Sequence, residues 1–184
     1  MTATDFLFRL VAMLDASRIP HMLAGSFASA YHGTPRTTQD VDVVIDPGSE
    51  QALARFVSKV SRAGYYVDAD HAREALRQRR QFNVIDGASG WKADLIIRKD
   101  RAFSREEFGR RLPAKVLGVD LFVASAEDVV LTKLEWAAKT GSDRQTADVE
   151  GIVRLKGATL DRAYVERWAK DLGVLDLWRR INPD

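Results

Sequence analysis

Residues 21–46 read HMLAGSFASAYHGTPRTTQDVDVVID, and this stretch decides the fold of the chain. Residues 21–24 predict a short strand, and Gly25-Ser26 then opens a short helix. After a loop, apolar and acidic side chains alternate over residues 40–46 with the period of a strand. The stretch therefore predicts two strands joined by a helix whose N-terminus lies at the end of the first strand.

The second of these strands carries two carboxylates in the order Asp40-Val41-Asp42. Residues two apart share a face of a strand, so both carboxylates project together while Val41, Val43 and Ile45 face the core. At about 4 Å and an effective dielectric near 20, their repulsion costs roughly 4 kcal/mol, which a divalent cation would relieve. Oxygen ligands suit Mg²⁺ or Mn²⁺. The alternative is a solvated strand face, but aspartate has a poor strand propensity.

A third acid, Asp94, lies in an otherwise apolar strand predicted over residues 91–97. Ala93, Leu95 and Ile97 fall on the face opposite to Asp94. If this strand lies beside residues 40–46, the three acids form a two-metal site for phosphoryl transfer. Taken alone, Asp94 is also explained as a charge on an edge strand.

Gly25-Ser26 stands where a strand passes into a helix. A helix N-terminus presents unpaired N–H groups that suit a phosphate, and a glycine lets the phosphate approach the backbone. The same dipeptide is also common as a plain turn and N-cap, so by itself it decides nothing.

The rest of the chain predicts an α/β (α+β) fold, a mixed sheet flanked by helices. We expect a catalytic domain over residues 1–124 and a helical region over residues 125–184 packed against it. The four tryptophans are expected in the core or between the two parts. The expected helices cover residues 6–14, 49–63, 71–80, 104–111, 125–139, 144–155, 161–172 and 174–181, and further strands cover 65–67, 81–85, 116–117 and 120–123.

Composition places few limits on function. The chain has 184 residues, no cysteine and a formal net charge of +2, which excludes disulfides and thiolate-bound metals. We found no apolar run long enough to cross a bilayer, so we expect a cytoplasmic protein with no membrane partner. Basic residues crowd positions 73–80 and 98–111 and either attract phosphates, RNA among them, or form solvated faces.

Together, the Gly25-Ser26 helix, the Asp40-Val41-Asp42 strand and Asp94 resemble the nucleotidyltransferase superfamily of DNA polymerase beta, antibiotic nucleotidyltransferases and CCA-adding enzymes. Among small members, the chain looks most like bacterial abortive-infection toxin nucleotidyltransferases. The resemblance implies a nucleotidyltransferase-like mixed sheet and covers most of the chain.

The resemblance also implies roles for the acids and for the Gly-Ser turn. Gly25 and Ser26 would hold the β and γ phosphates of a nucleoside triphosphate, and Asp40 and Asp42 would bind two Mg²⁺ or Mn²⁺ ions. Asp94 would bind the metal beside the attacking hydroxyl and help to deprotonate it.

Three further residues enter through the resemblance. Lys133 looks like the lysine that the helical part contributes to the triphosphate, although an exposed helix lysine explains it equally well. Arg36 and Thr38 precede the acids and could touch the substrate. Their loop is longer than in the smallest members, which leaves their placement open.

The implied function is metal-dependent transfer of a nucleoside monophosphate, for example from ATP, to a hydroxyl on an RNA end, a protein or a small molecule. A toxin–antitoxin or phage-defence setting, with a cognate antitoxin partner, would fit this resemblance. A catalytically silent module that binds nucleotide or a partner protein is the alternative, and an unrelated α/β domain with coincidental acids is a third.

Overall fold

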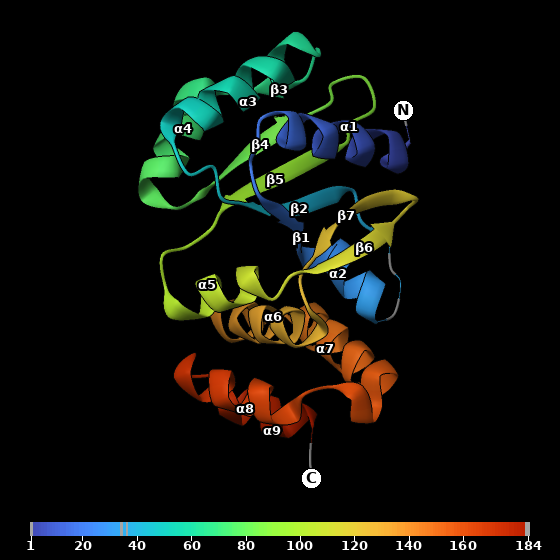
Figure 1. Ribbon diagram of the computed structural model, residues 1–184. Coiled ribbons are helices and arrows are strands. Elements are labelled where there is room, and N and C mark those ends of the chain that lie inside the picture. The colour runs from blue at the N-terminus through green and yellow to red at the C-terminus, as the bar shows by residue number, and fades with distance from the viewer. Residues whose placement is uncertain (1, 34, 36, 183–184) are drawn as a thin grey trace.

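The computed structural model describes residues 2–33, 35 and 37–182. Its centre is a mixed seven-stranded sheet in the order β3-β4-β5-β2-β1-β7-β6 (Figure 1). The strands are β1 (His21–Leu23), β2 (Asp40–Ile45), β3 (Tyr66–Val67), β4 (Gln81–Ile85), β5 (Lys92–Ile97), β6 (Leu112–Val116) and β7 (Val119–Val123). The predicted α/β class is confirmed.

Helices cover both faces of this sheet. Helices α1, α3 and α4 lie on one side, while α2, α5, α6 and α7 lie on the other, with α8 and α9 stacked beyond them (Figure 1). Their bounds are α1 (Ala3–Ala16), α2 (Gly25–His32), α3 (Glu50–Arg62), α4 (Ala69–Gln78), α5 (Ala102–Gly109), α6 (Ala126–Thr140), α7 (Asp143–Lys156), α8 (Arg162–Asp171) and α9 (Leu175–Ile181), with a 3-10 turn at Gly157–Thr159.

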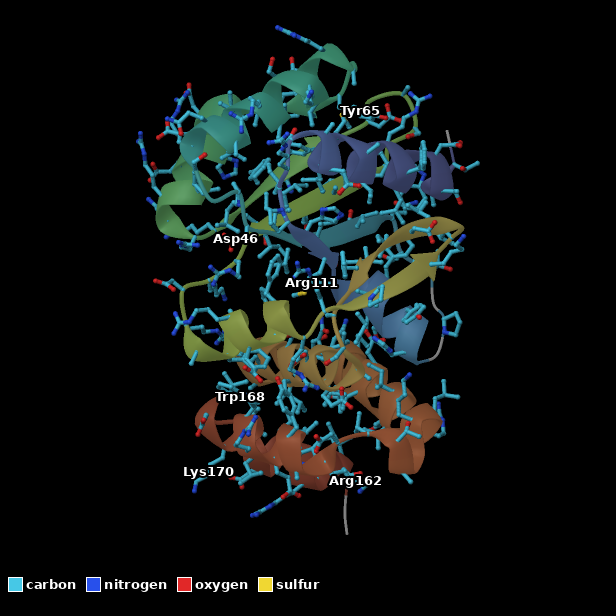
Figure 2. All side chains as sticks on the ribbon, in the orientation of Figure 1. Asp46, Tyr65, Arg111, Arg162, Trp168 and Lys170 are labelled. Atoms are coloured by element: carbon cyan, nitrogen blue, oxygen red, sulfur yellow. The ribbon has the colours of Figure 1, made fainter. Side chains whose placement is uncertain are left out.

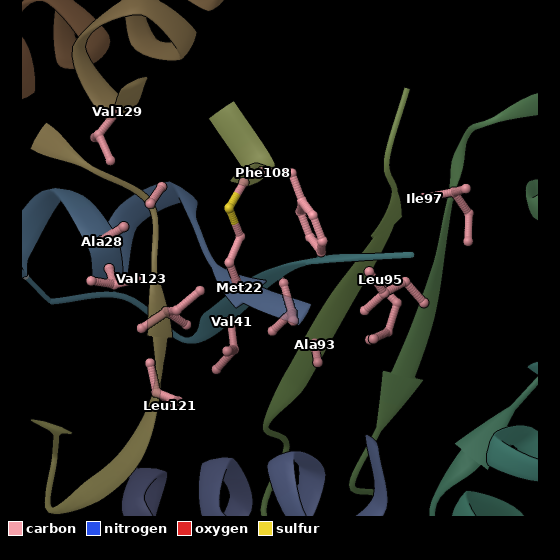
Figure 3. Close-up of a cluster of buried hydrophobic side chains, with 14 of the residues drawn as sticks. Met22, Ala28, Val41, Ala93, Leu95, Ile97, Phe108, Leu121, Val123 and Val129 are labelled. Atoms are coloured by element: carbon pink, nitrogen blue, oxygen red, sulfur yellow. The ribbon is translucent and has the colours of Figure 1, made fainter. Parts of the chain in front are cut away.

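Strands β2 and β5 form the centre of the sheet and run parallel to each other. Along both strands buried residues alternate with half-buried or exposed ones, so each contributes one apolar face to the core. Figure 3 shows Val41, Ala93 and Leu95 among the apolar side chains buried around these strands. The opposite face carries the acids, which places them on the side of α2 and α6.

The helices after residue 124 pack on the lower face of the molecule in Figure 1 through α6, which contacts α2, α7 and α8. Trp168 of α8 lies against Phe103 of α5, with 5.4 Å between the ring centres (Figure 2). Trp178 is fully buried, whereas Trp136 is 52% exposed, so the expectation of a buried Trp136 was wrong. The division of the chain at residue 124 stays a prediction.

Most helices and strands begin and end within two or three residues of the ends predicted from local sequence signals. Ser49 and Ser125 cap α3 and α6, and their hydroxyls accept N–H bonds of 3.2 Å from Ala52 and Asp128. The main difference is β6, which begins at Leu112, four residues before the predicted strand, and so includes Pro113. Proline is tolerated there since β6 is the edge of the sheet. None of the helices among the residues described has the length and apolarity to span a membrane.

Candidate active site

Asp42 and Asp94 lie directly beside each other in the middle of the sheet. The parallel register of β2 and β5 pairs Asp42 with Asp94 and pairs Asp40 with Lys92. All four residues alternate with buried apolar residues, so they project from one face. The predicted juxtaposition of Asp94 with the Asp40-Val41-Asp42 strand is therefore present in the fold.

The N-terminus of α2 packs directly onto Asp42. The backbone N–H of Ser26 donates a hydrogen bond to the Asp42 carboxylate, and the N–H of Ala24 donates to the Asp42 carbonyl oxygen at 2.9 Å. Gly25 has a φ of +56°, and a Cβ added to it would lie 2.7 Å from the Cβ of Asp42 and closer still to the carboxylate. The glycine is therefore required by its contact with Asp42, in addition to any role towards a phosphate.

Burial raises the pKa of Asp42, and the neighbouring charge of Asp94 raises it further. The hydrogen bond from Ser26 and the charge of Lys133 act in the opposite direction but do not outweigh the first two effects. The surroundings therefore disfavour the ionised form of the Asp42 carboxyl, and a bound cation would stabilise that form.

Lys92 brings a positive charge to the two acids beside Asp42. Its Nζ atom lies 3.5 Å from Oδ1 of Asp40 and 3.3 Å from Oδ1 of Asp94. Burial lowers the pKa of Lys92, but the charges of Asp94 and Asp40 more than offset this and raise it overall. Asn83, paired with Asp94 across β4 and β5, also donates a hydrogen bond to Oδ1 of Asp94.

Lys133 reaches the site from the other layer of the structure. It lies on α6, its side chain is 6% exposed, and its Nζ atom lies 2.7 Å from Oδ2 of Asp148 on α7. The alternative of an exposed helix lysine was therefore wrong. The charge of Lys133 also acts on Asp42 and lowers the pKa of that carboxyl, so the cation is close enough to influence the acidic strands.

The fold of the chain is similar to that of solved nucleotidyltransferases, although the sequence identity to them is low. The antibiotic-resistance factor ANT(2'')-Ia in solution is 12% identical, with a TM-score of 0.62 over 96% of each chain. The lincosamide antibiotic adenylyltransferase LnuA, lincomycin-bound, is 12% identical, with a TM-score of 0.56 over 83% of this chain and 96% of its own.

The chain has the nucleotidyltransferase fold. A nucleotidyltransferase-like protein from Paracoccidioides brasiliensis, at 14% identity and a TM-score of 0.53, shares it over 83% of this chain and 74% of its own. No protein-family model matches the chain, and no curated protein matches it in sequence. The abortive-infection subtype stays a prediction.

Within this nucleotidyltransferase fold, the two predicted substrate residues that precede the acids stand differently. The hydroxyl of Thr38 is shared with the backbone of Asp40, at 3.3 Å from its carbonyl oxygen and 3.4 Å from its N–H. Arg36 lies outside the described residues. Their roles towards a substrate stay predictions, as do those of Gly25, Ser26, Lys133 and the three acids.

The three acids share a face but do not form a compact cluster. Across residues 2–33, 35 and 37–182, no group of three acidic or histidine side chains is arranged to hold a metal ion. Asp42 adjoins Asp94, whereas both Asp40 and Asp94 contact the ammonium of Lys92. The fold therefore provides oxygen ligands of the right chemistry, with a lysine among them.

Sequence reasoning missed Lys92 and Asn83. The signal for Lys92 was available, because Lys92-Ala93-Asp94 has the same spacing as Asp40-Val41-Asp42 and so places Lys92 on the acidic face. Asn83 could be assigned only from the register of the β4–β5 hairpin.

Most of the basic residues that suggested an RNA surface are engaged by carboxylates. Arg98 donates to Asp46 at 2.8 Å, and Arg101 donates to both carboxylate oxygens of Glu135 at 2.7 and 2.5 Å. Further ion pairs join Arg73 to Glu50 and Asp70, Arg77 to Glu50, Arg105 to Asp100, and Arg110 to Glu127 and Asp128. These ion pairs reduce the positive charge that the surface offers to phosphates.

Proposed function

We propose that this protein is a metal-dependent nucleotidyltransferase that moves a nucleoside monophosphate from a nucleoside triphosphate to a hydroxyl acceptor. The observation that carries the proposal is the register pairing of Asp42 with Asp94. The N-terminus of α2 packs on Asp42, and the charge of Lys133 on α6 acts on the same carboxylate. This arrangement unites two acids, a helix N-terminus and a buried cation from three distant parts of the chain.

The reaction would exchange one phosphorus–oxygen bond for another. The acceptor hydroxyl oxygen bonds to the α-phosphorus, the bond from that phosphorus to the oxygen bridging to the β-phosphate breaks, and pyrophosphate leaves. Asp94 takes the hydroxyl proton, and its orientation is held by the hydrogen bond from Asn83. Lys133 and the helix N-terminus at Ser26 stabilise the negative charge of the triphosphate.

The donor atoms are of the chemical type that a hard divalent cation prefers. Asp42 and Asp94 lie beside each other, and Asp40 projects from the same face. Burial and the charge of Asp94 raise the pKa of Asp42. Carboxylate oxygens are the ligands that Mg²⁺ and Mn²⁺ prefer. When bound, such a cation would neutralise the charge that develops on the attacking and leaving oxygens.

The acceptor is best sought first among small molecules. ANT(2'')-Ia has been solved with adenylyl-2''-tobramycin and LnuA with lincomycin, so structures with this fold bind small acceptors. For this chain an RNA end or a protein hydroxyl remains in the proposal, but the ion pairs of Arg98 and Arg101 weaken the case for an extended RNA surface. A toxin–antitoxin setting, with ATP as donor and an antitoxin as partner, is the narrower form of the proposal.

One observation favours a catalytically silent binding module instead. Lys92 lies between Asp40 and Asp94, where it could replace a metal and leave a site that binds nucleotide without turnover. Labelling with α-³²P nucleoside triphosphates separates these two functions. The protein is incubated with Mg²⁺ and, in turn, with small hydroxyl compounds, total RNA and protein.

We expect transfer of label by the natural chain and its loss in Asp42→Asn and Asp94→Asn. Asp120→Asn is the matched control, because Asp120 is an exposed acid on β7, paired with Lys115 away from β2 and β5. Transfer that persists in Asp42→Asn would refute the site. Nucleotide binding without transfer to any acceptor would favour the silent module.

A further inference from the structure

Lys92 is a feature of the acidic face that a metal-dependent reaction does not explain. Its ammonium lies 3.5 Å from Asp40, its direct partner across the β2–β5 register, and 3.3 Å from Asp94, two residues further along its own strand. It therefore binds to the carboxylates that a divalent cation would need.

We infer that Lys92 is a built-in counter-cation that competes with the divalent cation for Asp40 and Asp94. The inference rests on the proposed function, since it concerns the metal of that same site. With the ammonium in place, one lysine offsets half of the negative charge of the two carboxylates. Binding of the metal then requires the lysine side chain to move away.

The surroundings of Lys92 allow such a movement. Its side chain is 34% exposed and that of Asp40 is 55% exposed, whereas the side chain of Asp94 is only 15% exposed. The ammonium therefore lies at the solvent side of the site, on a flexible four-carbon stem that can turn outward without disturbing the core. Asp94 keeps its hydrogen bond from Asn83 when the lysine leaves.

The same geometry explains why the acids coexist before a metal binds. Without a cation, Asp40, Asp42 and Asp94 would place three carboxylates on one face of two adjacent strands. Lys92 relieves this repulsion, which stabilises the fold and at the same time weakens metal binding. We therefore expect weak binding of a divalent ion by the protein alone and stronger binding when a triphosphate arrives with the metal.

The test measures metal binding directly, without turnover. Free Mn²⁺ is followed by electron paramagnetic resonance during titration of the natural chain, Lys92→Met and Lys115→Met in the absence of nucleotide. Lys115 is a matched control because it forms a similar 3.4 Å pair with Asp120 across β6 and β7, away from β2 and β5. Lys92→Gln serves as a second variant if Lys92→Met does not give a folded circular dichroism spectrum.

We expect Lys92→Met to bind Mn²⁺ about tenfold more tightly than the natural chain, as for the loss of a competing charge worth about 1.4 kcal/mol, and Lys115→Met to bind like the natural chain. A second readout is the ¹³Cε resonance of Lys92, identified by its absence in Lys92→Met, which should shift on addition of Mg²⁺ while that of Lys115 does not.

Equal Mn²⁺ affinity in the natural chain and Lys92→Met, or a Lys92 resonance unmoved by a bound metal, overturns the inference and leaves the proposed function intact. Failure of all three proteins to bind Mn²⁺, even with a non-hydrolysable ATP analogue present, overturns both.

Discussion

Gly25 packs so closely against the carboxylate of Asp42 that no other residue fits in its place. A Cβ at this position would lie 2.7 Å from the Cβ of Asp42, and the φ of +56° already disfavours a side chain. The turn that begins α2 can approach Asp42 of β2 this closely only because Gly25 has no side chain.

Gly25→Ala is expected to displace Asp42. We expect it to lower the free energy of unfolding by about 3 kcal/mol because of overpacking and backbone strain, and to lower nucleotidyl transfer about 100-fold because the reacting groups are misplaced. Gly48→Ala is the control: it has a φ of +68°, and its added Cβ would have no non-neighbouring contact within 4 Å in the described part of the chain. Urea unfolding and label transfer measure both, and equal activity of the two variants would contradict the contact.

Lys133 forms an ion pair with Asp148 and is proposed to bind the triphosphate, and two variants separate the structural role from the binding role. Lys133→Met removes the cation that lies 2.7 Å from the nearly buried Asp148, and we expect a loss of about 3 kcal/mol in stability. Combining it with Asp148→Leu should restore much of that stability, because the second buried charge is then also gone. Nucleotide affinity, measured by calorimetry, should stay low in the double variant. Recovery of affinity together with stability would show that Lys133 is only structural.

Glu107 makes the stability of the fold depend on pH. Burial, followed by the charge of Asp128, raises the pKa of Glu107 from 4.5 to about 8. The folded state thus holds the proton of Glu107 more tightly than the unfolded chain does. The contribution of this protonated carboxyl to the free energy of unfolding is fully present below about pH 4.5 and is lost as the pH rises to about 8.

We expect Glu107→Gln to remove this contribution. Relative to Glu107→Gln, the free energy of unfolding of the natural chain should fall by up to about 1.4 kcal/mol per pH unit across that interval. Urea unfolding at a series of pH values measures it. Glu106→Gln, an exposed acid on the same helix, should follow the natural chain. Parallel curves for the natural chain and Glu107→Gln would contradict the raised pKa.

The tryptophans should differ sharply in their contribution to stability. Trp178→Ala is expected to cost about 4 kcal/mol because it empties a fully buried site. Trp136→Ala should change stability by less than about 0.5 kcal/mol since the ring is 52% exposed. Thermal unfolding measures both. A large cost for Trp136→Ala would show that its ring is covered in solution.

Local sequence signals determined the elements and their faces. Side chains alternate along a strand, so the order Asp40-Val41-Asp42 by itself determines which of these residues face the core. Serine side chains act within a few residues of their own position, so Ser49 and Ser125 fixed where α3 and α6 begin. The fold class and the candidate acids followed from such local patterns.

Tertiary structure alone decided how these elements meet. The pairing of Asp42 with Asp94, the place of Lys92 between two acids and the burial of Lys133 against Asp148 each join residues from different elements. A pattern of alternating residues indicates which face of a strand is apolar. It does not indicate which strand lies beside it or in which register the two strands pair. The register that places one acid beside another is fixed only when distant segments bury their apolar faces together in one core.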